Sequence, residues 1–253
     1  MKNKISLQLT LSIALAIGWW LFLLLLGSLA HPGSGFYRVV EVLGGTGNGY
    51  IQALIYILFF YSVLQLIERR RFLRGQYQGF QLQLLPTRDQ LVLTPDEVNQ
   101  IKLQTIELEK AGQSLLVADF IKKACTQYRN DQSISETLQV FHAQVDTSKE
   151  EMEGQLEMIQ YLVGAVVSVG FIGTLIGLSS SIGLAHLAQT TEGMPQITRH
   201  LNVAFDTTLV ALLVGLVLNF FYHRYLAELD TFYSRSKSYV IDNLISRIYN
   251  PGK

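Results

Sequence analysis

The sequence predicts an all-α membrane protein that has four transmembrane helices and a helical cytoplasmic bundle. Of its 253 residues, 49% are hydrophobic and only 16% are charged, whereas about 25% is the usual charged fraction of a globular domain. The apolar residues are gathered in long runs that are separated by polar segments. A chain that is poor in charge and rich in long apolar runs is typical of membrane proteins.

Four runs reach the length of roughly 20 apolar residues that a membrane span needs. They cover residues 5–30, 50–67, 161–187 and 201–222. The first run could also be a signal peptide, because Ser28 and Ala30 are small enough for a cleavage site. Its apolar stretch of about 22 residues is longer than the 7–15 of most signal peptides, so we expect a span.

The basic residues predict how the four spans are oriented. Eighteen of the 20 Lys and Arg residues lie in the N-terminal tail, in residues 68–160 or in the C-terminal tail. Only Arg38 and Arg199 lie on the other side. Because cytoplasmic loops carry the excess of Lys and Arg, both termini should be cytoplasmic.

The spans divide the chain into four predicted segments. Residues 1–67 form a transmembrane hairpin, residues 68–160 a cytoplasmic helical domain, residues 161–222 a second hairpin and residues 223–253 a C-terminal cytoplasmic helix. The glycine-rich loop 31–49 should be a flexible connector rather than part of a pocket.

The cytoplasmic domain should be helical. Residues 75–93 are expected to be a connector with little regular structure, after which Thr94, Pro95 and Glu97 form a capping box that starts a helix ending near Lys110. A second helix is expected over 113–128. A third should start after a further capping box at 133–136 and run unbroken through the membrane to residue 187.

Composition argues against several classes of function. The single Cys125 excludes an internal disulfide, and the five histidines show no metal-ligand spacing, so we expect neither a metal nor another cofactor. A net charge of zero argues against nucleic-acid binding. An enzyme is not expected, because no nucleophile–base pair or phosphate-binding loop is visible.

The last two spans each carry a stripe of small residues on one helical face. In the third span the stripe comprises Gly170, Gly173, Gly177, Ser180 and Ser181, with Thr174 beside it. In the fourth span it comprises Ala204, Thr208, Ala211, Gly215 and Asn219. The two stripes either pack tightly together or form a socket for a foreign helix with a narrow polar passage.

Asp206 is the one carboxylate within a span, which makes it a candidate for ion handling. It cannot share the helical face of Thr208, which lies two residues further on. It could instead pair structurally with Asn202 or Arg199, and the sequence favours neither role.

These two spans resemble the MotA/TolQ/ExbB proton-channel family of inner-membrane stator and energy-transducing subunits. The resemblance rests on "GFIGTLIGL" at 170–178, a short connection, and "AFDTTLVALLVGL" at 204–216, and it covers residues 135–225 best. Each motif is weak alone, but their order and spacing are specific. Four spans with an inward N-terminus match the flagellar type, although its expected proline near the ion path is missing here.

The resemblance implies a pentamer in a bacterial inner membrane that surrounds two helices of a MotB-, ExbD- or TolR-like partner. An Asp on the partner helix would carry H⁺ or Na⁺ past hydroxyls of this chain. Thr174 and Thr208 would supply these hydroxyls, with Thr207 and Asp206 as further candidates along the ion pathway. The alternatives are a passive structural scaffold and a self-sufficient transporter, and the latter would normally carry ionisable sites near mid-membrane.

Two charged clusters mark a possible cytoplasmic interaction surface. The basic cluster consists of Arg69, Arg70, Arg71 and Arg74. The acidic cluster consists of Glu150, Glu151, Glu153 and Glu157. The basic cluster also suits anionic lipid next to a span. The acidic cluster either meets a cytoplasmic partner or a neighbouring subunit's arginines, or is a solvated face.

Overall fold

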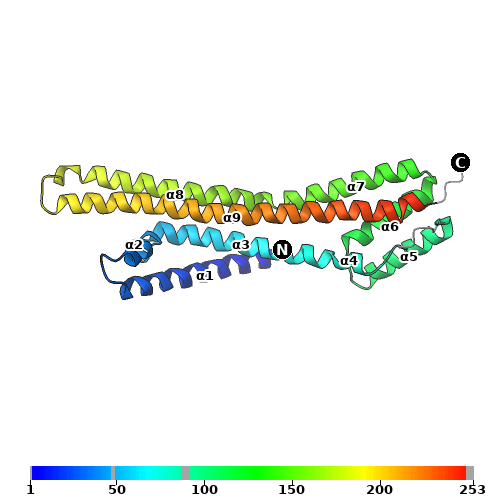
Figure 1. The fold of residues 1–253 in the computed structure, drawn as a ribbon, viewed down its shortest axis with the longest axis horizontal. Coiled ribbons are helices and arrows are strands. Elements are labelled where there is room, and N and C mark those ends of the chain that lie inside the picture. The colour runs from blue at the N-terminus through cyan, green and yellow to red at the C-terminus, as the bar shows by residue number, and fades with distance from the viewer. Residues whose placement is uncertain (1, 47–48, 87–91, 249–253) are drawn as a thin grey trace. The chain divides into compact units, whose positions relative to one another are not determined.

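The computed structural model describes residues 2–46, 49–86 and 92–248, and it is helical, with no strand in these ranges (Figure 1). The chain forms two compact units. Unit 1 comprises Met1–Glu68 and Glu157–His223, and unit 2 comprises Arg69–Leu156 and Arg224–Lys253. Within the described ranges, four helices are long and apolar enough to cross a membrane. The prediction of an all-α, multi-pass membrane protein is therefore confirmed.

Unit 1 contains the apolar helices. Its elements are α1 (Lys2–Leu29), α2 (Gly35–Val42), the first part of α3 (Tyr50–Gln76), α8 (Glu157–Gly183), η1 (Ala185–Leu187) and the first part of α9 (Gly193–Asn243). A small core joins them, and its members include Leu23 of α1, Ile55 of α3, Val166 of α8 and Val210 of α9. Many large apolar side chains face outward from this core, as expected of helices whose solvent is lipid.

Unit 2 is a helical domain with a buried apolar core and mostly polar exposed residues. It contains α4 (Gln78–Gln81), α5 (Pro95–Lys110), α6 (Leu116–Asp131), α7 (Ile134–Gly154), the end of α9 and η2 (Ile245–Arg247). Its core is aromatic, and the rings of Phe80 and Phe232 lie 5.8 Å apart. The hydroxyl of Tyr233 is within 3.0 Å of the Ser148 hydroxyl. The cytoplasmic location of this unit stays a prediction.

The local signals at the start of α5 are confirmed. The Thr94 Oγ1 accepts a hydrogen bond from the backbone N–H of Glu97, and the Glu97 carboxylate accepts one from the backbone N–H of Thr94 at 2.8 Å. Both halves of the capping box are thus present. The next helix starts at Leu116 and ends at Asp131, three residues later at each end than expected. It ends there because Gln132 adopts a left-handed conformation, with a φ of 50°.

The predicted unbroken third helix is wrong at one point. Helix α7 ends at Gly154 and α8 begins at Glu157, and the intervening residues form a turn. The N–H of Leu156 bonds to the Glu153 carbonyl at 2.8 Å, which is a tightened three-residue step. Glycine is the weakest helix former apart from proline, so Gly154 accounts for the break. The apolar helix then ends at Gly183 rather than at residue 187.

Two segments that were expected to be irregular contain helices. The loop 31–49 contains α2, whose N-cap Ser34 accepts a hydrogen bond from the Tyr37 N–H at 3.1 Å. The connector 75–93 contains the single turn α4, and residues 87–91 of it lie outside the described part of the chain. Eight residues are too few to form a stable helix alone, so α2 depends on its contacts with the rest of unit 1.

Candidate functional site

The glycine stripe of α8 lies directly against α9 of the same chain, and the two helices run alongside each other in Figure 1. A Cβ added to Gly170, Gly173 or Gly177 would come closer than 3.0 Å to Ala211, Thr207 or Ala204, respectively. Glycine is therefore required at these positions for the helices to approach. In this chain the stripe is used for packing between the last two spans.

The hydroxyls of Thr174 and Thr208 meet across this interface. The two Oγ1 atoms are in hydrogen-bonding contact. Thr174 Oγ1 also donates to the Ala204 carbonyl at 3.1 Å, and Thr208 Oγ1 donates to the Gly170 carbonyl at 3.0 Å. The structure thus brings together the two residues that the sequence singled out for the ion pathway.

The two hydroxyls make three contacts, one with each other and one each with a carbonyl, but they have only two protons to donate. Each threonine hydroxyl carries one proton and two acceptor lone pairs. If Thr174 and Thr208 both donate to carbonyls, neither has a proton for the other, and if one donates to the other, a carbonyl loses its donor. The pair can therefore change its donor pattern by rotating a hydroxyl, and it keeps lone pairs that can accept a hydrogen bond from a third group.

The hydroxyl pair lies on the face of α9 that is turned away from α3. Val210 packs in the core with Ile51 and Ile55 of α3. Because successive residues of a helix are 100° apart, Thr208 points about 160° away from Val210. Around the pair lie large exposed apolar side chains on both helices, namely Phe171, Leu175, Phe205 and Leu212. The two hydroxyls thus lie beside a mainly apolar exposed face, on which α8 also exposes Ser168 and Ser179.

Asp206 pairs with Arg38 of α2 and not with Asn202 or Arg199, the two partners that the sequence had suggested. The guanidinium binds both carboxylate oxygens, at 2.7 and 3.0 Å, and it also contacts Glu41 at 2.9 Å. The Asp206 side chain is only 7% exposed. A bidentate ion pair is a strong way to hold a carboxylate in place, so the geometry favours a structural role for Asp206. Its role in ion handling stays a prediction.

The other residues of the stripes lie as follows. The Ser181 hydroxyl is buried and bonds to the Gly177 carbonyl at 2.9 Å, within its own helix. Ser180 is half-buried and bonds in the same way to the Ile176 carbonyl.

In the stripe of α9, Gly215 packs against Val167 of α8. Thr207 is buried and donates to the Ala204 carbonyl at 2.9 Å, while Asn219 is exposed.

The two charged clusters of the predicted cytoplasmic side are not brought together as ion pairs. Arg70 binds Glu228 of α9, with Nε–Oε2 at 3.0 Å, and Arg69 hydrogen-bonds Gln155. Arg71 and Arg74 are exposed.

In the acidic cluster, Glu153 lies 3.5 Å from Lys149. The remaining members, Glu150, Glu151 and Glu157, are exposed. Most of the acidic cluster is thus open to a partner or to solvent.

Arg38 is the partner of Asp206 that sequence reasoning missed. The signal that could have revealed it is its charge, because Arg38 is one of only two basic residues on the predicted outer side. Glu41 follows three residues later, which is the spacing of a helical ion pair. Within the described residues, His, Cys, Asp and Glu form no group of three that could hold a metal ion.

Comparison with protein families gives a match to a family model. Residues 113–237 match the MotA/TolQ/ExbB proton channel family. This range covers α6, α7, α8 and most of α9. Searches of curated proteins and of solved structures find no match. The matched range contains the packed glycine stripe and the hydroxyl pair, and it supports a proton-channel role in energy transduction. Residues 113–237, which are just under half of the chain and include its last two spans, are thus similar to the MotA/TolQ/ExbB proton channel family.

Proposed function

We propose that the chain is the channel-forming subunit of a motor that converts a proton or sodium gradient into mechanical work. The observation that carries this proposal is the Thr174–Thr208 hydroxyl pair, which joins the two family-matched spans beside a mainly apolar exposed face. An apolar membrane face needs no hydroxyls to contact lipid, whereas an ion that passes it needs oxygens to replace water.

Five copies of the chain would surround two transmembrane helices of a MotB-, ExbD- or TolR-like partner dimer. In this arrangement the exposed face that contains Phe171, Leu175, Phe205 and Leu212 turns inward against the partner helices. An Asp of the partner would carry the ion past Thr174 and Thr208, whose free lone pairs accept a hydrogen bond from the protonated Asp or coordinate the sodium ion. The complex would lie in a bacterial inner membrane with both termini of the chain in the cytoplasm.

Unit 2 would carry the output to the cytoplasm. Helix α9 runs without interruption from Gly193 to Asn243, so it contributes both to the channel face and to unit 2. The exposed glutamates Glu150 and Glu151 would then contact a cytoplasmic partner. Arg71 and Arg74 stay available for the same partner or for anionic lipid.

A passive scaffold is the second candidate, and one observation favours it. Each threonine of the pair also donates to a backbone carbonyl of the opposite helix, at 3.1 and 3.0 Å. The hydroxyls could therefore act as clamps between α8 and α9, which such bonds do in membranes at about 0.6–2 kcal/mol each. A scaffold would lose stability without these hydroxyls but would have no ion flow to lose.

The composition of the complex tests the proposal. The tagged full chain is purified from its own cells in a native lipid nanodisc, and the mass of the assembly and the proteins in it are measured. The proposal predicts five copies of this chain together with two copies of a single-span protein that has an aspartate within its span. A homo-oligomer that contains no second membrane protein would favour the scaffold and overturn the proposal.

A further inference from the structure

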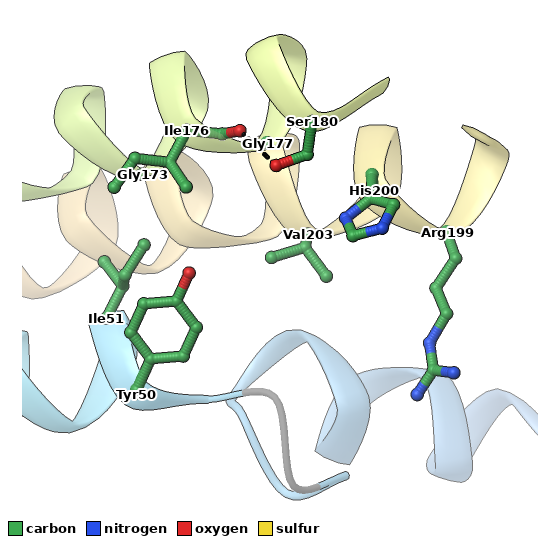
Figure 2. A pocket seen from close by; sticks show the side chains of 9 residues that line it. All are labelled: Tyr50, Ile51, Gly173, Ile176, Gly177, Ser180, Arg199, His200 and Val203. Carbon is green, nitrogen blue, oxygen red and sulfur yellow. Dashed lines mark hydrogen bonds between the residues drawn. The ribbon is translucent and has the colours of Figure 1, made fainter. Parts of the chain in front are cut away.

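A hollow between α3, α8 and α9 opens on the side of the membrane where α8 and α9 are connected (Figure 2). Its volume is about 280 Å³. Figure 2 shows Tyr50 and Ile51 of α3 on one side and Ile176 and Ser180 of α8 on the other, with His200 and Val203 of α9 between them. All the lining residues belong to unit 1.

The rim and the floor of this hollow differ in chemistry. The rim carries the hydroxyl of Tyr50, the imidazole of His200 and the guanidinium of Arg199, all on exposed residues. The floor and walls are apolar, formed by Ile51, Ile176 and Val203 with the two glycines Gly173 and Gly177. From Ser180 to Gly173 the hollow follows α8 for about 10 Å into the apolar layer. A ligand that fits it has a negative head and an apolar tail.

Arg199 is free to bind such a head. Among the described residues it has no carboxylate partner, and Glu41, which lines an adjoining hollow together with Arg199, is already bound by Arg38. Asp206, which lines that adjoining hollow as well, is bound by the same arginine. The charge on Arg199 is therefore not neutralised within the described part of the chain.

We propose that this hollow binds an anionic phospholipid of the outer leaflet, with its phosphate at Arg199 and one acyl chain along Ile176 and Val203. The ion path does not compete for this place. The hollow lies on the α3 side of the α8–α9 pair, whereas Thr208 points away from α3. Basic residues at the ends of transmembrane helices attract anionic headgroups in this way. The lipid would fill the gap between the two helical hairpins and would stabilise α8 and α9 on the face that is turned toward α3.

Lipid binding to the purified full chain tests the proposal. The delipidated protein is titrated with phosphatidylglycerol or with phosphatidylcholine, and bound lipid is counted by native mass spectrometry. We expect tighter binding of phosphatidylglycerol by about fivefold, since one basic residue at a membrane surface contributes about 1 kcal/mol. Arg199→Gln should remove this preference. Ile176→Trp, which fills the apolar wall, should weaken the binding of both lipids.

Control variants and soluble competitors separate the possible outcomes. Arg235→Gln removes a basic side chain that lies over the Phe80 ring in unit 2, and it should change nothing. Inorganic phosphate and glycerol phosphate carry the head without the tail and should not displace the lipid. The proposal is overturned if wild type holds both lipids equally, if Arg199→Gln keeps the preference while remaining folded by circular dichroism, or if phosphate alone displaces phosphatidylglycerol.

Discussion

Arg38 and Asp206 lie 168 residues apart in the sequence and form a bidentate ion pair, with the guanidinium 2.7 and 3.0 Å from the two carboxylate oxygens. The pair attaches α2, between the first two spans, to the last span. Because the Asp206 side chain is only 7% exposed, a carboxylate left there without its arginine would be costly. The pair therefore fixes the position of the last span relative to the first hairpin.

The first prediction concerns this ion pair. Arg38→Met should lower the free energy of unfolding in detergent by roughly 2–4 kcal/mol, because it leaves the Asp206 carboxylate buried and unpaired. Adding Asp206→Leu should recover much of the loss. Glu41→Gln, which removes the more exposed partner of Arg38, should have little effect. Single changes whose effects simply add in the double variant would show that the two residues do not interact.

The second prediction concerns the glycine stripe of α8. Gly173→Val should destabilise the helix pair by about 1–3 kcal/mol, because a Cβ there would collide with Thr207. Gly164→Val is the matched control on the same helix, since a Cβ at that position meets no atom within 4 Å. Thermal unfolding in detergent measures both. Equal behaviour of the two variants would mean that α8 and α9 do not pack as described.

The third prediction concerns the acidic cluster. The double variant Glu151→Lys and Glu153→Lys should impair the driven process while the protein still inserts and assembles, because it reverses charge on a surface proposed to meet a cytoplasmic partner. Glu107→Lys, at an exposed position of α5, is the control. Growth or motility of cells that carry each variant reports the output. Normal output from the double variant would show that the cluster contacts solvent only and binds no partner.

The fourth prediction concerns the pH dependence of Cys125. Burial in unit 2 raises the pKa of this thiol to about 12, so it stays neutral in the folded protein over the usual pH range. Iodoacetamide should label the folded protein slowly and almost independently of pH between 7 and 9. Because an unfolded thiol ionises near pH 8.5, the thiol's contribution to stability is complete below that pH and falls as the pH rises above it. Fast labelling of the folded protein at pH 7 would contradict this burial.

Cys125→Ala provides the control for that experiment. It should show no labelling, and its loss of stability above about pH 8.5 should be smaller than that of wild type. An identical pH dependence in the two proteins would mean that other groups cause the effect.

The sequence was sufficient for features that depend on neighbouring residues. The apolar runs predicted all four spans, and the Thr94–Glu97 pattern predicted the start of α5, since capping involves residues only three apart. Helical periodicity also placed the small residues of each span on one face. It could not show that the glycine face packs against α9 of the same chain. Periodicity indicates which residues share a helical face, but it does not identify the helix that this face contacts.

The parts that were missed depend on long-range contacts. The partner of Asp206 comes from α2, a short helix in a glycine-rich loop whose stability comes from packing rather than from its own sequence. The break at Gly154 is a balance between one weak helix former and strong helical neighbours, which residue patterns alone cannot decide. The hollow beside Arg199 arises where three helices meet, so no single segment predicts it.

Ion flux through the complete complex tests the central proposal most directly. The chain and the partner that co-purifies with it are reconstituted in liposomes, a potassium diffusion potential is imposed, and proton or sodium uptake is recorded. Wild type should conduct only with its partner. The double variant Thr174→Val and Thr208→Val should reduce the flux to that of empty liposomes, while Thr174→Ser with Thr208→Ser, which keeps both hydroxyls, should conduct.

The control for this measurement removes hydroxyls that bond only within their own helices. Ser168 donates to the Gly164 carbonyl at 2.9 Å and Thr231 to the Ala227 carbonyl at 2.8 Å, so Ser168→Ala with Thr231→Val should conduct as wild type does. Full flux through the assembled Val variant would contradict the account, because the hydroxyl pair would then be only a clamp between α8 and α9.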